Sequence, residues 1–169
     1  MIEVAIALGV ISFALLSVVA LLPQGINSNR VSGEETRAVC ILSAMEADLR
    51  NTHPAASNGV SRLFGFQLPY GTNASGGYVI NPSLTPTTSL GAGFTTGLND
   101  SELPVPLTPR PRYQASVLYT EIPPAGSTSS VKARLVVNWP PVSETTIAAV
   151  TDTAKTSGVV ETIVSFPTP

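Results

Sequence analysis

Charged residues, cysteine and histidine are scarce in this sequence. Only 12% of its 169 residues are charged, about half the usual fraction, which favours an exported, loop-rich protein over a cytosolic enzyme. The net charge of −2 gives no electrostatic argument for a nucleic-acid partner. Cys40 is the sole cysteine and His53 the sole histidine, so the sequence excludes an intrachain disulfide and a zinc site built from cysteines or paired histidines.

Catalytic motifs are missing as well. The sequence contains no phosphate-binding glycine loop, no HExxH and no GxSxG, and adjacent carboxylates such as Glu34 and Glu35 point in different directions on a helix. Asn99, Asp100 and Glu102 offer oxygen ligands for calcium, but three ligands fall short of a full shell, so a solvated loop is the default interpretation. We therefore expect no enzyme, no cofactor and no metal.

A long uncharged run, from Val4 to Leu22, begins almost at once. Nineteen helical residues span about 28 Å, close to the roughly 30 Å hydrocarbon core of a bilayer, and so predict a transmembrane helix. A signal peptide would need a basic start, and none is present. Arg30 and Arg37 follow the run and by themselves favour a head domain inside the cell, whereas a basic leader upstream would reverse that orientation.

Glu3 is the one charged residue before Arg30. A carboxylate within hydrocarbon is costly unless it is paired. The alternative is that Glu3 sits at the membrane interface, where the positive end of the helix dipole favours an anion. Ala5 and Gly9, four residues apart, have the spacing that lets helices approach closely, although a lone anchor also contains such residues.

Three short motifs carry a resemblance to a known family: IEV at residues 2–4, ALG at 7–9 and LLP at 21–23. In this order the N-terminus resembles that of mature type IV pilins and of type II secretion pseudopilins. The continuation ALLPQGI, followed by a second helix, also resembles the pilin-like cassette proteins of some bacterial genomes. The resemblance is specific over about the first 25 residues.

The resemblance implies a structural subunit of a type IV pilus-like or pseudopilus filament, with Glu3, Gly9 and Pro23 as assembly residues. It implies a leader that a prepilin peptidase cuts before N-methylation, and pilus or secretion assembly machinery as a further partner. The chain would sit in the bacterial inner membrane with its head outside the cytoplasm. It would then polymerise with copies of itself or related pilins into a periplasmic or extracellular filament.

The spacing before Glu3 departs from the family pattern. The family usually places four residues before this glutamate, and here only Met1 and Ile2 precede it. Either two residues and the leader lie upstream of the chain, or Met1 comes from a mis-set start. In the family this glutamate pairs with the N-terminal amine of a neighbouring subunit, so the identity of that amine stays open.

Beyond the anchor helix of residues 1–23, a flexible joint is expected over 24–33 and a head domain over 34–169. Pro23 should kink or end the helix, and the glycines and asparagines that follow favour helix poorly. Ser32 is a candidate N-cap for a second helix that ends near His53. Its apolar stripe is Ala38, Ile41, Leu42, Met45 and Leu49, with Cys40 a small core or boundary residue beside it.

Strand patterns dominate the head domain. Strands are predicted at residues 62–68, 78–80, 112–121, 131–139 and 159–166, with an antiparallel hairpin between the third and fourth that buries one face. A Pro-, Ser- and Thr-rich loop is predicted over 81–112. The expected fold is therefore α+β, a long N-terminal helix packed on an antiparallel sheet of about four strands, which agrees with a pilin-like layout.

Two other functional classes stay open. In the first, the helix only anchors an extracytoplasmic binding or adhesion module that does not polymerise and that recognises its ligand through the 81–112 loop. Trp139 and the tyrosines would then form an exposed aromatic patch, whereas alternating strand positions favour core. An anchored enzyme is the third class, and no motif supports it.

Overall fold

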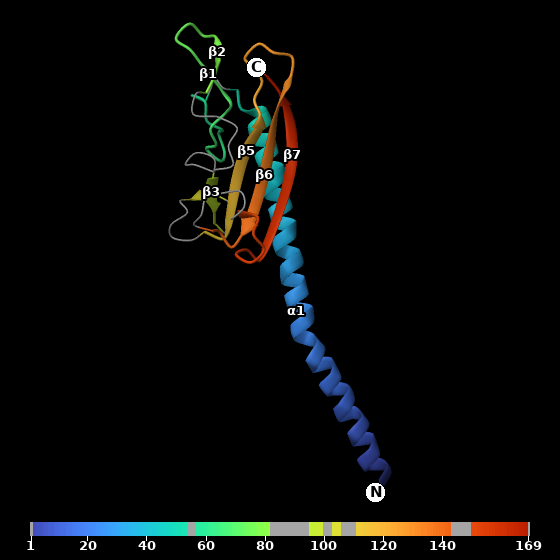
Figure 1. The fold of residues 1–169 in the computed structure, drawn as a ribbon. Helices are drawn as coiled ribbons and strands as arrows, with labels where there is room; N and C mark the ends of the chain where they lie inside the picture. Colours follow the sequence, from blue (N-terminus) through green and yellow to red (C-terminus); the bar gives the residue numbers. More distant parts are fainter. Residues whose placement is uncertain are drawn as a thin grey trace. The chain divides into compact units, whose positions relative to one another are not determined.

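The chain has an α+β architecture, and its described residues form one long helix followed by seven strands, most of which are labelled in Figure 1. The computed structural model describes residues 2–53, 57–81, 95–99, 103–105, 111–142 and 150–168. These fall into two compact units, 1–37 and 38–169, which we describe separately. The elements are α1 (Ile2–Asn51), β1 (Tyr70–Thr72), β2 (Tyr78–Ile80), β3 (Thr95–Leu98), β4 (Pro104–Val105), β5 (Tyr113–Glu121), β6 (Ser130–Trp139) and β7 (Gly158–Pro167).

Helix α1 passes through Pro23 without ending, so the predicted break over 24–33 is wrong as secondary structure. Proline costs about 3 kcal/mol in a helix interior, but a helix already nucleated on both sides can absorb that local cost. Ser32 is likewise not an N-cap: it lies inside α1, and its carbonyl accepts a hydrogen bond from Thr36 Oγ1 at 2.8 Å. Whether 24–33 bends in solution stays a prediction.

The last part of α1 supplies one side of the head-domain core, as the apolar stripe predicted. Five stripe residues are buried against the sheet: Ala38, Ile41, Leu42, Met45 and Leu49. Cys40, expected at the core or its boundary, is instead exposed, because its position in the helical turn directs it away from the sheet. The 3.6-residue period therefore located the packed face but not its edge.

The head is built on a five-stranded antiparallel sheet in the order β4-β3-β5-β6-β7, and β1 pairs separately with β2. The strands predicted at 78–80, 112–121, 131–139 and 159–166 are confirmed to within a residue or two. The large sheet has five strands rather than about four, because β3 and β4 arise within the segment predicted as an irregular loop. β3 forms by pairing with β5, and a local sequence pattern does not predict a strand that depends on so distant a partner.

The segment RLFGFQL at 62–68 is not a strand. Residues 62–64 form a turn, Gly65 has a φ of +70°, and only an isolated bridge joins Val60 to Gln67. Asp48 of α1 holds this turn: its Oδ1 accepts the Leu63 amide and its Oδ2 the Phe64 amide, both at 3.1 Å. A buried carboxylate far away in sequence thus replaces the sheet hydrogen bonds that the pattern predicted.

Both faces of the central hairpin are covered at one end, where burial of a single face was expected. The first face packs on α1. On the other face, Val136 packs with Val150. The side-chain oxygen of Gln114 also accepts hydrogen bonds there, from the side-chain amide of Asn138 at 3.3 Å and from the backbone amide of Val142 at 2.8 Å. Buried polar side chains at outward positions are therefore held by the chain that follows β6.

The Trp139 ring lies against Gly158, its partner in the β6–β7 register. A Cβ atom at Gly158 would come within 2.2 Å of the ring. The Tyr113 ring packs edge-on against the same indole, with 6.1 Å between the ring centroids, so the indole has little room to move. Gly158→Ala should lower the free energy of unfolding by about 2–3 kcal/mol.

Urea unfolding followed by the fluorescence of Trp139, the sole tryptophan, measures the Gly158→Ala effect. Gly71→Ala is the matched control, because Gly71 also lies in a strand and nothing stands within 4 Å of its added Cβ. Equal midpoints for the two variants would contradict the predicted clash.

The Tyr119 hydroxyl is buried and donates a hydrogen bond to the Gln67 carbonyl at 2.9 Å. Burial, and to a lesser degree the Asp48 carboxylate, holds its pKa well above the ordinary value of 10.0. The folded state therefore keeps this proton at a pH where the unfolded chain loses it. Stability is fully present below pH 10 and should fall above it by about 1.4 kcal/mol per pH unit for this group.

Unfolding free energies measured between pH 9 and 11 test the Tyr119 effect. Tyr119→Phe should start about 1 kcal/mol lower at neutral pH, for the lost hydrogen bond, and then decline less steeply. Burial also raises the pKa of Tyr70, so a shallower slope should persist in the variant. Parallel curves for variant and wild type would contradict the assignment to Tyr119.

Candidate functional site

The N-terminal half of α1 carries a continuous apolar surface. Every residue from 2 to 33 is exposed within the chain. Thirteen large apolar side chains between Ile2 and Leu22 are 55–77% exposed: Ile2, Val4, Ile6, Leu8, Val10, Ile11, Phe13, Leu15, Leu16, Val18, Val19, Leu21 and Leu22. No side of this stretch is covered by the described part of the chain.

Exposure on this scale is unfavourable in water. Burying one such side chain stabilises by about 1.5–3 kcal/mol, so covering the thirteen stabilises by at least on the order of 20 kcal/mol, which exceeds the whole stability of an ordinary domain. The helix is long and apolar enough to cross a membrane, and none of its most apolar 18-residue window is buried. It therefore requires either lipid or other apolar protein surfaces around it.

The structure places the three predicted assembly residues along this one helix. Glu3 lies in its first turn, Gly9 within the apolar run and Pro23 just after it. The first cation along the helix is Arg30, about 40 Å from Glu3, so α1 offers this carboxylate no partner within reach. An added Cβ at Gly9 meets nothing within 4 Å, so only a second molecule would use the close approach that glycine permits.

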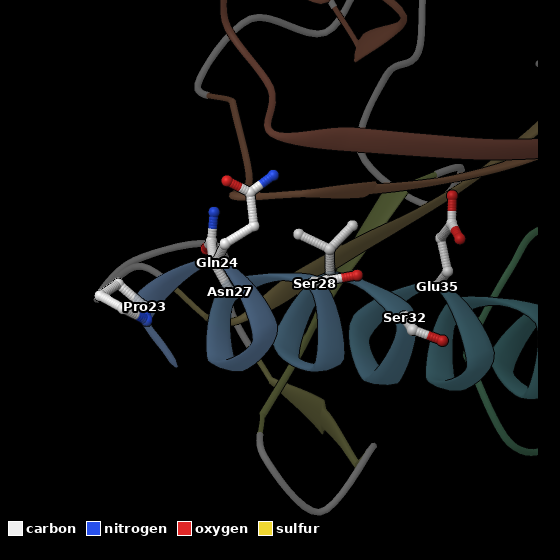
Figure 2. Close-up of a pocket in the computed structure, with 7 residues that line it drawn as sticks. Pro23, Gln24, Asn27, Ser28, Ser32 and Glu35 are labelled. Carbon is white, nitrogen blue, oxygen red and sulfur yellow. The ribbon is translucent and has the colours of Figure 1, made fainter. Parts of the chain in front are cut away.

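A polar face follows directly on the apolar run, and sequence reasoning missed it. Figure 2 shows Gln24, Asn27, Ser28 and Glu35 on α1 around a hollow of about 610 Å³. The lining residues recur every three to four positions, the spacing of one helix face. Of these residues, Asn27 and Ser28 were interpreted as poor helix formers in a joint and Ser32 as an N-cap, whereas the spacing of the whole set was the signal for a helical face.

This face combines hydrogen-bonding and apolar groups. The amides of Gln24 and Asn27 and the hydroxyls of Ser28 and Ser32 line it together with Pro23 and Val31, and Glu35 is the one ionisable side chain among its described residues. Arg30, nearby in the sequence, is held in an i,i+4 ion pair with Glu34 at 3.3 Å. The face can contact lipid headgroups, water or another amphipathic helix.

The head domain offers a second, smaller hollow of about 200 Å³. It lies where the C-terminal end of α1 meets Tyr70 of β1 and Phe166 of β7, with Arg50 and His53 at its polar side. His53 Nε2 is 2.7 Å from the Tyr78 hydroxyl. Among the described residues no group of three or more potential metal ligands is present.

The aromatic residues considered for an adhesive patch belong to the core. Trp139, Tyr113 and Tyr119 are each at most 5% exposed, which confirms the core interpretation for them. Of the candidate calcium ligands, Asn99 follows β3, while Asp100 and Glu102 lie outside the described residues. The candidate functional surface therefore remains the N-terminal helix.

Comparison with known proteins adds no relative. No protein-family model, curated protein or solved structure matches this chain significantly. The functional argument therefore rests on the helix, its single carboxylate and the head domain.

Proposed function

We propose that the chain is a structural subunit of a type IV pilus-like or pseudopilus filament that assembles through its N-terminal hydrophobic helix. One observation carries the proposal: α1 exposes thirteen large apolar side chains along residues 2–22 while the head domain has its own complete core. A bilayer covers such a helix before assembly, and a bundle of identical helices covers it afterwards.

Glu3 has different surroundings in a polymerising helix and in a simple anchor. In an anchor the carboxylate stays at the membrane interface, where the helix dipole favours it, whereas inside an apolar bundle it is costly without a partner. In a bundle it meets the amine of a neighbouring subunit, which neutralises both charges and favours one axial register. The absence of a cation along residues 4–29 supports a partner from another molecule.

The remaining partners and the location follow from this proposal. The chain resides in the bacterial inner membrane with a single span and its head outside the cytoplasm, and it is then drawn into a periplasmic or extracellular filament. A prepilin peptidase and a pilus or secretion assembly machinery act on it. The α+β layout, a long helix against an antiparallel sheet, is compatible with a pilin-like head.

Isolation of filaments from the producing cell tests the proposal. Sheared surface and periplasmic filaments should contain this chain, and its native N-terminal sequence and mass should reveal cleavage and N-methylation together. A chain that stays in the membrane fraction, and that prepilin peptidase does not process, would establish the non-polymerising anchored module instead.

A further inference from the structure

The two edges of the large sheet are built differently. One ends in β4, which has two residues and begins with Pro104, and short strands and proline are what proteins use to blunt an edge. The other ends in β7, which pairs with β6 along all ten residues and has no strand on its outer side in the described chain. Only the β7 edge offers a long row of backbone groups for pairing.

β7 also lacks the usual protections against pairing. It contains no lysine and no proline before Pro167, and its register with β6 shows no bulge. Its one charged residue, Glu161, is drawn onto the neighbouring strand by Arg134, whose Nε donates to the carboxylate at 3.1 Å. No unpaired charge on β7 therefore opposes pairing of this edge with another strand.

Ile163 stands at the middle of β7 on the face away from α1. At 72% exposure it is the most exposed large apolar side chain of the head domain in the described residues. Its register partner in β6 is Arg134, which is engaged with Glu161. An apolar side chain left uncovered at the centre of an unprotected edge is typical of an interaction surface.

We propose that β7 pairs antiparallel with β7 of a second copy of this chain, in the register that places Ile163 opposite Ile163. This two-fold arrangement uses the same strand on both sides and adds a strand to an open edge. It buries the two isoleucines against each other and sets Glu161 opposite Ser165, so no like charges meet. The neighbouring register, centred on Thr162, would instead place Ile163 against the Glu161 carboxylate.

The two-fold arrangement also fixes how the paired heads are oriented. A two-fold axis normal to the sheet reverses the strands and equally reverses the stretch of α1, residues 38–51, that lies along the sheet within the same unit (Figure 1). The two paired heads therefore run in opposite directions, and the contact does not depend on polymerisation.

Disulfide cross-linking tests the pairing. Full-length chain carrying Cys40→Ser is prepared with either of two affinity tags, and the two forms are reconstituted together into vesicles and mildly oxidised. Ile163→Cys should give a disulfide dimer carrying both tags, because opposite residues of an antiparallel pair approach closely enough. Glu161→Cys mixed with Ser165→Cys should do the same, whereas neither should form a dimer in a mixture of its own two tags.

Ala125→Cys, in the exposed turn before β6, is the matched control. A dimer from Ala125→Cys as abundant as that from Ile163→Cys would indicate random collision and overturn the proposal. So would the absence of two-tag dimers from both Ile163→Cys and the Glu161→Cys with Ser165→Cys mixture. Trp139 fluorescence verifies that each variant is folded.

The oligomeric state provides a second readout without oxidation. Sedimentation of the full-length chain in detergent should show a mass that rises with protein concentration, because pairing follows mass action. Ile163→Lys should lower this association, while Ile80→Lys, at an exposed position of β2, should leave it unchanged. Equal association by the two lysine variants would overturn the proposal, and an added soluble β7 peptide should lower the association of wild type.

Discussion

Asp48→Ala is expected to lower the free energy of unfolding by about 4 kcal/mol. The carboxylate is 9% exposed and accepts the backbone amides of Leu63 and Phe64. Its removal leaves two amides without partners in a buried turn, and a hydrogen bond to a charged group contributes about 1.5–3 kcal/mol.

The loss should propagate into the core. The turn that Asp48 holds places the Phe64 and Phe66 rings 5.6 Å apart within the buried cluster. Without it these rings lose their fixed position, so the unfolding transition followed by Trp139 should broaden as well as shift. Asp48→Asn, which retains one acceptor oxygen, should cost about half as much.

Glu46→Ala is the matched control for Asp48. Glu46 lies on the same turn of α1 and pairs with Arg50 at 2.8 Å, but this pair is exposed. Exposed i,i+4 pairs contribute about 0.5 kcal/mol or less, so the midpoint should hardly move. If Glu46→Ala and Asp48→Ala were equally destabilising, the cost would belong to the helix and not to the turn.

Glu3→Gln is expected to reduce filament yield by at least about tenfold, the equivalent of some 1.4 kcal/mol at each helix contact. The substitution keeps the shape and length of the side chain and removes its charge. An unpaired carboxylate in hydrocarbon costs about 2.5–3.5 kcal/mol on insertion scales, so pairing it with an amine is what selects the register. Without the charge, neither the penalty nor the selection remains.

Sheared filaments quantified by immunoblot measure this effect, and Trp139 fluorescence confirms that the head stays folded. Glu46→Gln is the matched control, because it removes one exposed carboxylate from α1 at a position beyond both the apolar run and the polar face. Normal filaments from Glu3→Gln would favour the anchored, non-polymerising module. Failure of both variants would point to a general effect of helix charge.

The candidate surface was predictable where the pattern is local. Nineteen consecutive uncharged residues fix a membrane-length helix whatever follows them, and Glu3 stands out because nothing around it is charged. The polar face at Gln24 to Glu35 was missed, because Pro23 and the glycines were given more weight than the i,i+4 spacing of the amides and hydroxyls. Intrinsic propensity is a weak predictor when both flanking segments are already helical.

The sequence by itself determined the apolar helix, the packed stripe from Ala38 to Leu49 and the long strands β5, β6 and β7, since the periods of 3.6 and 2 residues record which side chains are buried. Tertiary structure alone decided the turn held by Asp48, the pairing that creates β3 and the open edge at β7. Each of these depends on groups distant in sequence, and a local pattern contains no information about a partner that only folding brings near.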